Sequence, residues 1–220
     1  MWCIPELTDT FIERMMDILE IYERPYNPQE PVICLDEKSM QLLAHVREPI
    51  SVTPGIPERY DSEYKRKGTA SIFVMVEPKV GTRHLIMKER KRYKEYAVCM
   101  DFLSTFYNEV DKIIVIQDNF RTHSKKSLIK AFGKKKADKI MEKVEFHYTP
   151  KHGSWLNMAE IEIGVMDTEC LRKRRIPDMH TLTHELTAWK IRRNDKKAVI
   201  NWRFTRKKAE EKFKLIKNKM

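Results

Sequence analysis

Two aspartates in this 220-residue chain stand at positions where a folded protein could use them for chemistry. Asp36 follows the apolar run Val-Ile-Cys-Leu at 32–35, and Asp118 follows Ile-Ile-Val-Ile-Gln at 113–117. Both patterns are typical of a buried strand that ends in a carboxylate. A charge buried without a partner costs several kcal/mol, so an acid in such a place needs a cation or hydrogen bonds.

Each aspartate also has a purely structural alternative. Glu37 and Lys38 could mark the exit of the first strand into water, which would make Asp36 its first solvated residue. Asp118 or Asn119 could start an Asx turn between a strand and a helix. Ligand sites of α/β sheets gather at the carboxyl ends of strands, so two such aspartates on neighbouring strands favour a shared site.

A third acid is expected from the stretch TPKHGSWLNMAEIE at 149–162, where a stiff loop precedes two glutamates. Glu160 and Glu162 lie about 200° apart around a helix, so both cannot join one site. One is expected to face the aspartates and the other to face water. Asn157 and Glu160 have the spacing of a helix capping box, a structural alternative for Glu160. The local sequence leaves the choice between the two glutamates open.

Carboxylates from three separate elements suit hard divalent cations. Mg²⁺ is held by one or two carboxylates, and the remaining ligands are water and phosphate oxygens. Two ions about 4 Å apart would clamp the attacking and leaving oxygens of an in-line phosphoryl displacement. The pattern therefore indicates metal-dependent phosphoryl transfer.

The elements that must position these acids follow from periodicity and turn residues. Strands are expected at 32–36, 71–78, 83–89, 113–117 and 144–148, with a long loop or hairpin at 47–68. Helices are expected at 6–24, at 92–110, at 124–141 with a break near Gly133, and from the glutamates almost to the end, with breaks at 176–177 and 194–202. Three strands followed by alternating helices and strands predict an α/β fold, a mixed five-stranded sheet with helices on both faces. Ribonuclease H-like nucleases and integrases use this order.

Composition limits the classes of function. At 41% hydrophobic and 34% charged residues, the chain can bury a core. It has no run of about 18 apolar residues, so no membrane span is expected, and its first residues lack a secretory signal pattern. The four cysteines are scattered and form no CxxC pair, which argues against a zinc ribbon or a disulfide framework and favours the cytoplasm.

The positive charge is concentrated at one end of the chain. Residues 171–220 hold 17 Lys and Arg against 5 Asp and Glu, whereas the other 170 residues hold 26 against 27. Such a segment is suited to bind phosphate with release of counterions, although a solvated helical surface has the same composition. The densest cluster, and the best candidate for phosphate contacts, is Arg172, Lys173, Arg174 and Arg175.

Longer blocks carry a family resemblance: LDEKSMQLL from residue 35, VIQDNFRTHS from 115, HYTPKHGSWLNMAEIEIGVM from 147, RRIPDMHTL from 174 and WRFT from 202. Together they resemble the catalytic domain of the acid-triad (Asp-Asp-Glu) transposases of bacterial insertion sequences, relatives of the mariner group. The resemblance covers nearly the whole chain. In the mariner group the third acid ends a Leu-Asn-Pro-Ile-Glu block. Matching Leu156 and Asn157 to this block selects Glu160 over Glu162, although Met158 and Ala159 replace Pro-Ile.

The resemblance implies a ribonuclease H-like fold, with two Mg²⁺ or Mn²⁺ ions held by Asp36, Asp118 and Glu160. It implies that water cleaves a DNA strand and that the freed 3′-hydroxyl then attacks target DNA. Double-stranded DNA, as transposon ends and target, and a second copy of the chain are the implied partners. Asn119, His123 and His152 are candidates for DNA contact. For His123, an equal alternative is that it caps a helix or orients the acids without contacting DNA.

Three parts are expected: an N-terminal helix and linker at 1–28, the catalytic domain at 29–170 and a basic helical extension at 171–220. Such enzymes usually carry helix-turn-helix domains before the catalytic domain, and none is apparent before residue 4. Two other functions share these features. One is a nuclease or resolvase that stops at hydrolysis, and the other is a non-catalytic DNA-binding or dimerisation remnant.

Overall fold

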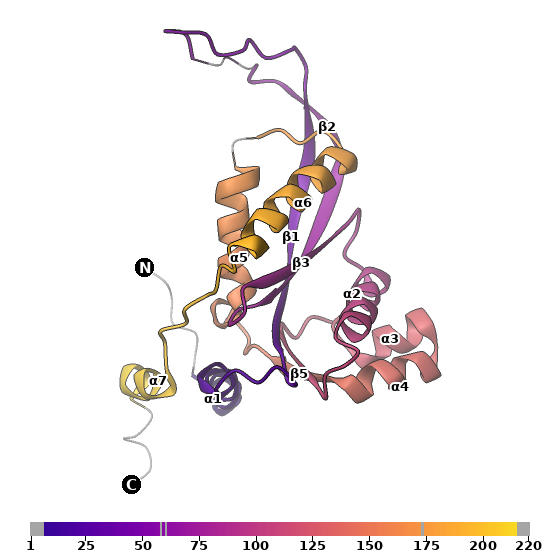
Figure 1. Cartoon of the computed structure of the whole chain (residues 1–220), viewed down its shortest axis with the longest axis vertical. Helices are drawn as coiled ribbons and strands as arrows, with labels where there is room; N and C mark the ends of the chain where they lie inside the picture. The colour runs from indigo at the N-terminus through magenta and orange to yellow at the C-terminus, as the bar shows by residue number, and fades with distance from the viewer. Residues whose placement is uncertain (1–6, 58, 60, 173, 215–220) are drawn as a thin grey trace.

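The computed structural model describes residues 7–57, 59, 61–172 and 174–214. Its centre is a five-stranded mixed sheet in the order β3-β2-β1-β4-β5 (Figure 1). The first three strands form an antiparallel meander, and β4 and β5 run parallel to β1. The strands are β1 (Val32–His45), β2 (Tyr64–Glu77), β3 (Thr82–Lys88), β4 (Ile113–Gln117) and β5 (Val144–Tyr148). This sheet confirms the predicted fold class.

Helices cover both faces of the sheet. One face is covered by α2 (Tyr93–Phe106), α3 (Lys125–Phe132) and α4 (Lys134–Lys143). The other face is covered by α1 (Asp9–Glu23), α5 (Met158–Met166), α6 (Met179–Asp195) and α7 (Arg206–Phe213). Figure 1 shows α2, α3 and α4 on one side of the strands and α5 and α6 on the other. Two short helices flank α5: a 3-10 turn at Ser154–Leu156 and a π-helix at Asp167–Leu171.

The first strand is longer than predicted. The sequence suggested an end at Asp36, but β1 continues to His45 and pairs with β2 along most of its length. Side chains alternate between the two faces of a strand. Leu35 therefore joins the core under α2, whereas Cys34 joins the core under α1 and α5. By the same alternation, Asp36 lies on the α5 face and Glu37 on the α2 face.

The predicted loop or hairpin at 47–68 forms the outer part of the β1–β2 hairpin. It extends away from the rest of the molecule at the top of Figure 1. Short bridges at Ile50–Arg59 and Thr53–Ile56 continue the pairing into this arm. Ile50, Val52 and Ile56 are all exposed there. The arm has almost no core of its own.

The predicted break near Gly133 is confirmed. Gly133 has φ 82°, a left-handed conformation that favours glycine, and it separates α3 from α4. Within the described residues, none of the helices is both long and apolar enough to cross a membrane.

Candidate active site

The two predicted aspartates lie near each other on adjacent interior strands of the sheet, Asp36 on β1 and Asp118 just after β4. In the parallel pairing of β1 with β4, Cys34 lies beside Ile116. Two residues further along each strand direction, Asp36 therefore lies beside the position of Asp118, which directly follows β4. Asp118 thus follows the carboxyl end of β4, a position where α/β proteins place their ligand sites, and Asp36 lies within β1 beside it.

Asp36 has the most perturbed carboxyl group of the site. Burial raises its pKa to about 7, and the charges of Glu160, Asp118 and Glu37 act in the same direction. A hydrogen bond from the Glu37 backbone N–H, at 2.7 Å to Oδ1, opposes the rise. Because Glu160 and Asp118 both contribute, the three predicted acids are close enough to repel one another. Such mutual repulsion is typical of sites that bind cations.

Asp118 is held by a histidine five residues further along the chain. His123 Nδ1 lies 2.5 Å from Asp118 Oδ1, and His123 Nε2 lies 2.8 Å from Glu37 Oε1. Burial would lower the pKa of His123, but the hydrogen bonds and charges of the two carboxylates outweigh it and raise the pKa to about 9. In turn, His123 lowers the pKa of Asp118 below its ordinary value, although burial acts in the opposite direction. The imidazole thus bridges β1 and the end of β4.

The His123 side chain is buried, and its ring stacks on Tyr96 of α2 with 4.6 Å between ring centroids. Both ring nitrogens face carboxylates, so this geometry fits the supporting role rather than direct contact with DNA. For Glu37, the second partner of His123, one alternative from the sequence was a solvated position at the exit of the strand. Its side chain is 8% exposed instead. The apolar residues Met40, Leu42 and Leu43, which continue the strand, were the signal that could have revealed this.

Glu160 lies in the first turn of α5, and its side chain is exposed. The capping box that the sequence suggested does not close. The Asn157 N–H donates to the Ser154 carbonyl instead, and the Asn157 side chain accepts from the Ala159 N–H. Among the described residues, the Glu160 carboxylate has no hydrogen-bond or ion-pair partner, so it is available to a ligand.

Asn157 connects the helix of Glu160 to the strand of Asp36. Its side-chain amide donates to the Leu35 carbonyl at 2.8 Å and lies 3.4 Å from Asp36 Oδ2. Its side chain also caps α5, as described above. One buried residue therefore fixes the start of α5 against β1.

Glu162 corrects one expectation. It was expected to face water, because it lies opposite Glu160 on the helix. It is instead fully buried, in contact with the guanidinium groups of Arg83 and Arg193. Helical geometry correctly separated the two glutamates, but it could not show that two arginines cover the second one.

Two other predicted site residues, Asn119 and His152, line a hollow at the surface, whereas His123 is buried. The hollow has a volume of about 420 Å³ and borders Asp118, and Arg14 and Lys151 also line it. Arg14 lies on α1 and was not a predicted site residue. Arg14 is far from Asp118 in the sequence, so local patterns could not show that the two residues line the same hollow. The hollow is open, cationic and next to an acid of the site.

The basic cluster at 172–175 is only partly available. Arg174 pairs with Glu185 at 2.9 Å, and Arg175 donates to the carbonyls of Asp61 and Glu63 in the β1–β2 arm. Arg172 is exposed, and Lys173 lies outside the described residues. The charge run did not reveal that two of its arginines hold other parts of the chain.

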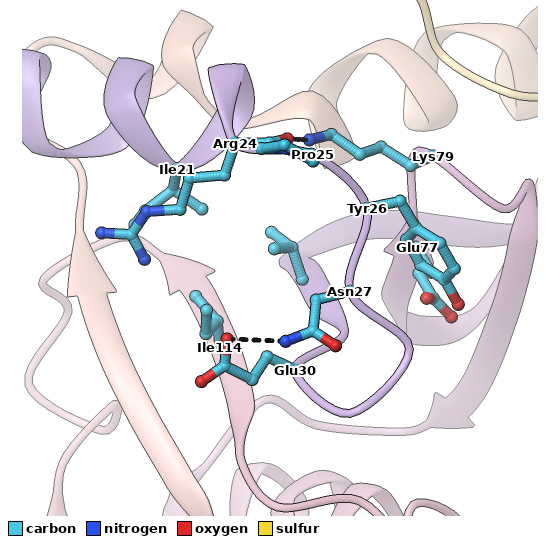
Figure 2. Close-up of a pocket in the computed structure, with 10 residues that line it drawn as sticks. Ile21, Arg24, Pro25, Tyr26, Asn27, Glu30, Glu77, Lys79 and Ile114 are labelled. Atoms are coloured by element: carbon cyan, nitrogen blue, oxygen red, sulfur yellow. Dashed lines mark hydrogen bonds between the residues drawn. The ribbon is translucent and has the colours of Figure 1, made fainter.

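A separate cavity of about 310 Å³ lies at the opposite end of the sheet. Figure 2 shows Tyr26, Asn27 and Glu77 around it, with the end of α1 above and Ile114 at its wall. Ile114 is near the start of β4, whereas Asp118 follows its end. This cavity is therefore remote from the three acids.

The three acids are chemically suited to bind a divalent cation, but their side chains do not surround a common binding point in this structure. All three offer carboxylate oxygens, which are the ligands that Mg²⁺ and Mn²⁺ prefer. In the described part of the chain, however, no three His, Cys, Asp or Glu side chains lie close enough together to hold an ion as they stand.

Comparisons with known proteins identify a family and a shared fold. A family model described as DDE superfamily endonuclease matches residues 31–183. No curated protein matches the chain.

Solved structures of a mariner transposase, Mos1, share the fold. The Mos1 paired-end complex with Mn matches with a TM-score of 0.57 at 17% identity, over 90% of this chain and 60% of that one. The Mos1 strand transfer complex matches with a TM-score of 0.55 at 17% identity, over 87% of this chain and 57% of that one. The Mos1 catalytic domain matches with a TM-score of 0.54 at 14% identity, over 90% and 96%. This chain thus spans about 60% of the Mos1 chains in those complexes, but nearly all of the catalytic domain.

Proposed function

Since the chain belongs to the DDE superfamily endonucleases, we propose that it is the catalytic domain of a transposase that cleaves DNA strands and joins the freed ends to target DNA. The observation that carries this proposal is that Asp36 and Asp118 adjoin on neighbouring strands and that Glu160 is close enough for its charge to act on Asp36. The charges of the other two acids help to raise the pKa of Asp36, as expected of carboxylates placed to share a cation.

In this proposal Asp36, Asp118 and Glu160 hold two Mg²⁺ or Mn²⁺ ions. When bound, such ions polarise the scissile phosphate and stabilise the attacking and leaving oxygens. His123 and Glu37 fix the Asp118 carboxylate, because the imidazole occupies Oδ1 and leaves Oδ2 for a ligand. Asn157 keeps the helix of Glu160 against the strand of Asp36.

We place the DNA backbone along the hollow beside Asp118. Arg14 and Lys151 supply positive charge there, and Asn119 and His152 supply hydrogen-bond donors. Phosphate contacts of this kind position a duplex without reading its sequence. The cluster Arg172, Lys173, Arg174 and Arg175 is proposed as a further phosphate contact, with Arg172 as an exposed member that lies outside the contacts of Arg174 and Arg175.

The wider setting is also proposed. The catalytic domain at 29–170 would act with the helices at 1–28 and 171–220 as a homodimer, on the ends of a bacterial insertion sequence, in the cytoplasm. Support comes from the positive charge of the C-terminal part and from the fold shared with Mos1 complexes that hold transposon ends.

Nicking of supercoiled DNA in Mn²⁺ tests the central proposal. The wild type is compared with Asp36→Ala, Asp118→Ala and Glu160→Ala, and with Glu142→Ala as a control that removes an exposed acid on α4. We expect activity in the wild type and the control, and none above background in the three variants. Equal activity in all five proteins would refute the catalytic assignment.

A second arm separates transfer from hydrolysis. The protein is given a DNA with a free 3′-hydroxyl end and a target duplex, and joined products are measured. Joined products are expected. Acid-dependent cleavage with no joined product would instead identify a nuclease of the same fold.

A further inference from the structure

The helix that carries Glu160 has a buried ionic cluster on its opposite side. Glu162 is two residues further along α5, about 200° around the helix, and is fully buried. Two guanidinium groups hold its carboxylate, from Arg83 on β3 and from Arg193 near the end of α6. These three residues are termed the Glu162 cluster.

Arg193 holds the carboxylate by two hydrogen bonds, and Arg83 holds it by one hydrogen bond and one ion-pair contact. Arg83 Nε lies 2.8 Å from Glu162 Oε1, and Arg83 Nη2 donates to Oε2 at 3.2 Å. Arg193 donates from Nε to Oε1 and from Nη2 to Oε2, both at 3.2 Å. Two-point contacts fix the direction of a carboxylate as well as its distance. Glu162 therefore cannot turn about the helix axis without breaking several contacts.

Arg83 anchors the cluster to the body of the protein. Its Nη1 donates to the Gly81 carbonyl at 2.8 Å, and its Nη2 also donates to the Ala198 carbonyl at 2.6 Å. The Asn194 side chain pairs with both the N–H and the carbonyl of Arg83, at 3.0 Å each. The cluster thus joins α5, β3, α6 and the segment after α6.

Burial of this charge needs a reason other than stability. A buried ion pair seldom stabilises a fold more than well-packed apolar side chains of the same volume would. What it adds is direction, which apolar contacts lack. The other buried residues of α5, Met158, Ala159 and Met166, are apolar, and their side chains make no directional contact. Asn157 hydrogen-bonds to β1 only at the start of the helix.

We infer that the Glu162 cluster sets the rotation of α5, so that Glu160 faces Asp36 and Asp118. This inference rests on the proposed function, because it assigns Glu162, Arg83 and Arg193 as positioning residues for the third catalytic acid. Arg193 and Ala198 lie beyond residue 183, where the family-model match ends. The end of α6 is thus part of the apparatus that places Glu160.

The first test replaces the charge and keeps the shape, with Glu162→Gln. Its matched control is Glu20→Gln, which removes the partner of Arg24 from an exposed ion pair at the end of α1. Three quantities are measured: the midpoint of thermal unfolding, Mn²⁺ binding to the DNA-free protein by electron paramagnetic resonance, and kcat and KM for nicking. The second quantity does not depend on turnover.

For Glu162→Gln we expect about tenfold or greater weakening of Mn²⁺ binding and a similar loss of kcat, as is typical when a group that orients a metal ligand is removed. The KM for DNA is expected to stay within about twofold, because the phosphate contacts lie elsewhere. Glu20→Gln is expected to match the wild type. A folded Glu162→Gln protein with unchanged Mn²⁺ affinity and kcat would overturn the inference.

A second variant covers the case in which Glu162→Gln does not fold. The triple change Glu162→Leu, Arg83→Met and Arg193→Met replaces the cluster by apolar side chains, a kind of exchange that is often neutral or stabilising. A folded triple variant with weakened Mn²⁺ binding and low kcat supports the positioning role. A triple variant with wild-type binding and activity, or one that does not fold, shows that the cluster serves the fold itself and refutes the role.

Failure of the proposed function gives a different result. In that case the wild type shows no Mn²⁺-dependent nicking that requires Asp36, Asp118 and Glu160. If those acids are required and the Glu162 variants behave like the wild type, the positioning role alone is wrong.

Discussion

The Nδ1 atom of His123 lies 2.5 Å from the Oδ1 atom of Asp118. The opposite nitrogen of the same ring contacts Glu37, so one imidazole joins two carboxylates from different strands. Removing the imidazole would take a partner from both carboxylates, whereas removing one carboxylate would leave the imidazole paired with the other.

Changing His123→Ala is expected to lower the free energy of unfolding by about 3 kcal/mol, because it leaves the buried Glu37 carboxylate unpaired. Urea denaturation at pH 7 measures the change. Adding Glu37→Gln to this variant should recover part of the loss, since the stranded charge is gone. His180→Ala, at an exposed position on α6, is the control and should stay within about 0.5 kcal/mol of the wild type. Equal stability of the His123 and His180 variants would contradict the role of the bridge.

Changing Asn157→Asp is expected to destabilise the fold even though Asp caps helices as well as Asn does. The new carboxylate would face the Leu35 carbonyl and Asp36, where the Asn157 amide now donates. An unsatisfied buried acceptor costs about 2 kcal/mol. Asn27→Asp, at an exposed turn, is the control. Urea denaturation that finds Asn157→Asp as stable as the wild type would show that the amide contact to Leu35 contributes nothing.

Changing Gly81→Ala tests the contact between the β2–β3 turn and the segment after α6. Gly81 has φ 76°, and an added Cβ would lie 2.5 Å from the backbone carbon of Lys197. Gly133 has nearly the same φ, 82°, with open space around it. Gly133→Ala is therefore expected to cost about 1 kcal/mol from the left-handed backbone alone, and Gly81→Ala clearly more. Thermal unfolding of the two variants compares them, and equal costs would exclude the steric contact.

Acid is expected to weaken the fold through His84. Burial lowers the pKa of His84 to about 4, assisted by the charge of Lys190, and the ring packs against Phe102 and Phe106. The unfolded chain therefore binds more protons than the folded one between about pH 6.5 and 4. The folded state is therefore most stable with respect to His84 above pH 6.5. As the pH falls toward 4, the free energy of unfolding is expected to decrease by up to about 3 kcal/mol.

The measurement for His84 is a difference between two proteins. His84→Phe cannot be protonated, so the stability difference between this variant and the wild type should grow in favour of the variant as the pH falls from 6.5 to 4. The raised pKa of Asp36 acts in the opposite direction in the same range, but it is common to both proteins and cancels. A stability difference that is constant with pH would show that folding does not change the pKa of His84.

The hollow beside Asp118 predicts a salt-dependent loss of DNA binding. Arg14→Ala combined with Lys151→Ala removes two cations from its lining. Each phosphate contact adds about 0.9 to the slope of log K against log salt, so the slope should fall by roughly 2. Fluorescence anisotropy over a range of salt concentrations measures it. Lys126→Ala with Lys139→Ala, on the opposite face, should leave the slope unchanged, and equal slopes in both double variants would place the DNA elsewhere.

Local patterns were enough to predict much of the sheet. Asp118 follows a short strand of four apolar residues and Gln117, a pattern that is typical of a buried strand. Gly133 stood out as a break within a helical run. The end of β1 was placed wrongly, because Asp36, Glu37 and Lys38 read as an exit into water. A strand that pairs with a long hairpin partner on one side can carry charged residues that local sequence assigns to solvent.

The parts of the site that could not be predicted depend on distant partners. Glu162 meets Arg83, 79 residues earlier, and Arg193, 31 residues later. Nothing in the local sequence distinguishes these three residues from other charged residues. They meet because β3, α5 and α6 pack together in the fold. His123 was predicted at the site, but its link to Glu37 spans 86 residues and needed the length of β1.

The alternation of side chains along β1 has a consequence for insertions and deletions. Asp36 and Glu37 are neighbours in sequence but project to opposite faces of the sheet, one toward Glu160 and the other toward His123. Adding or removing a single residue between Val32 and Asp36 would exchange the faces of the two acids while leaving an acidic pair at the same place. Length polymorphism at this point would abolish the chemistry without changing which residue types are present.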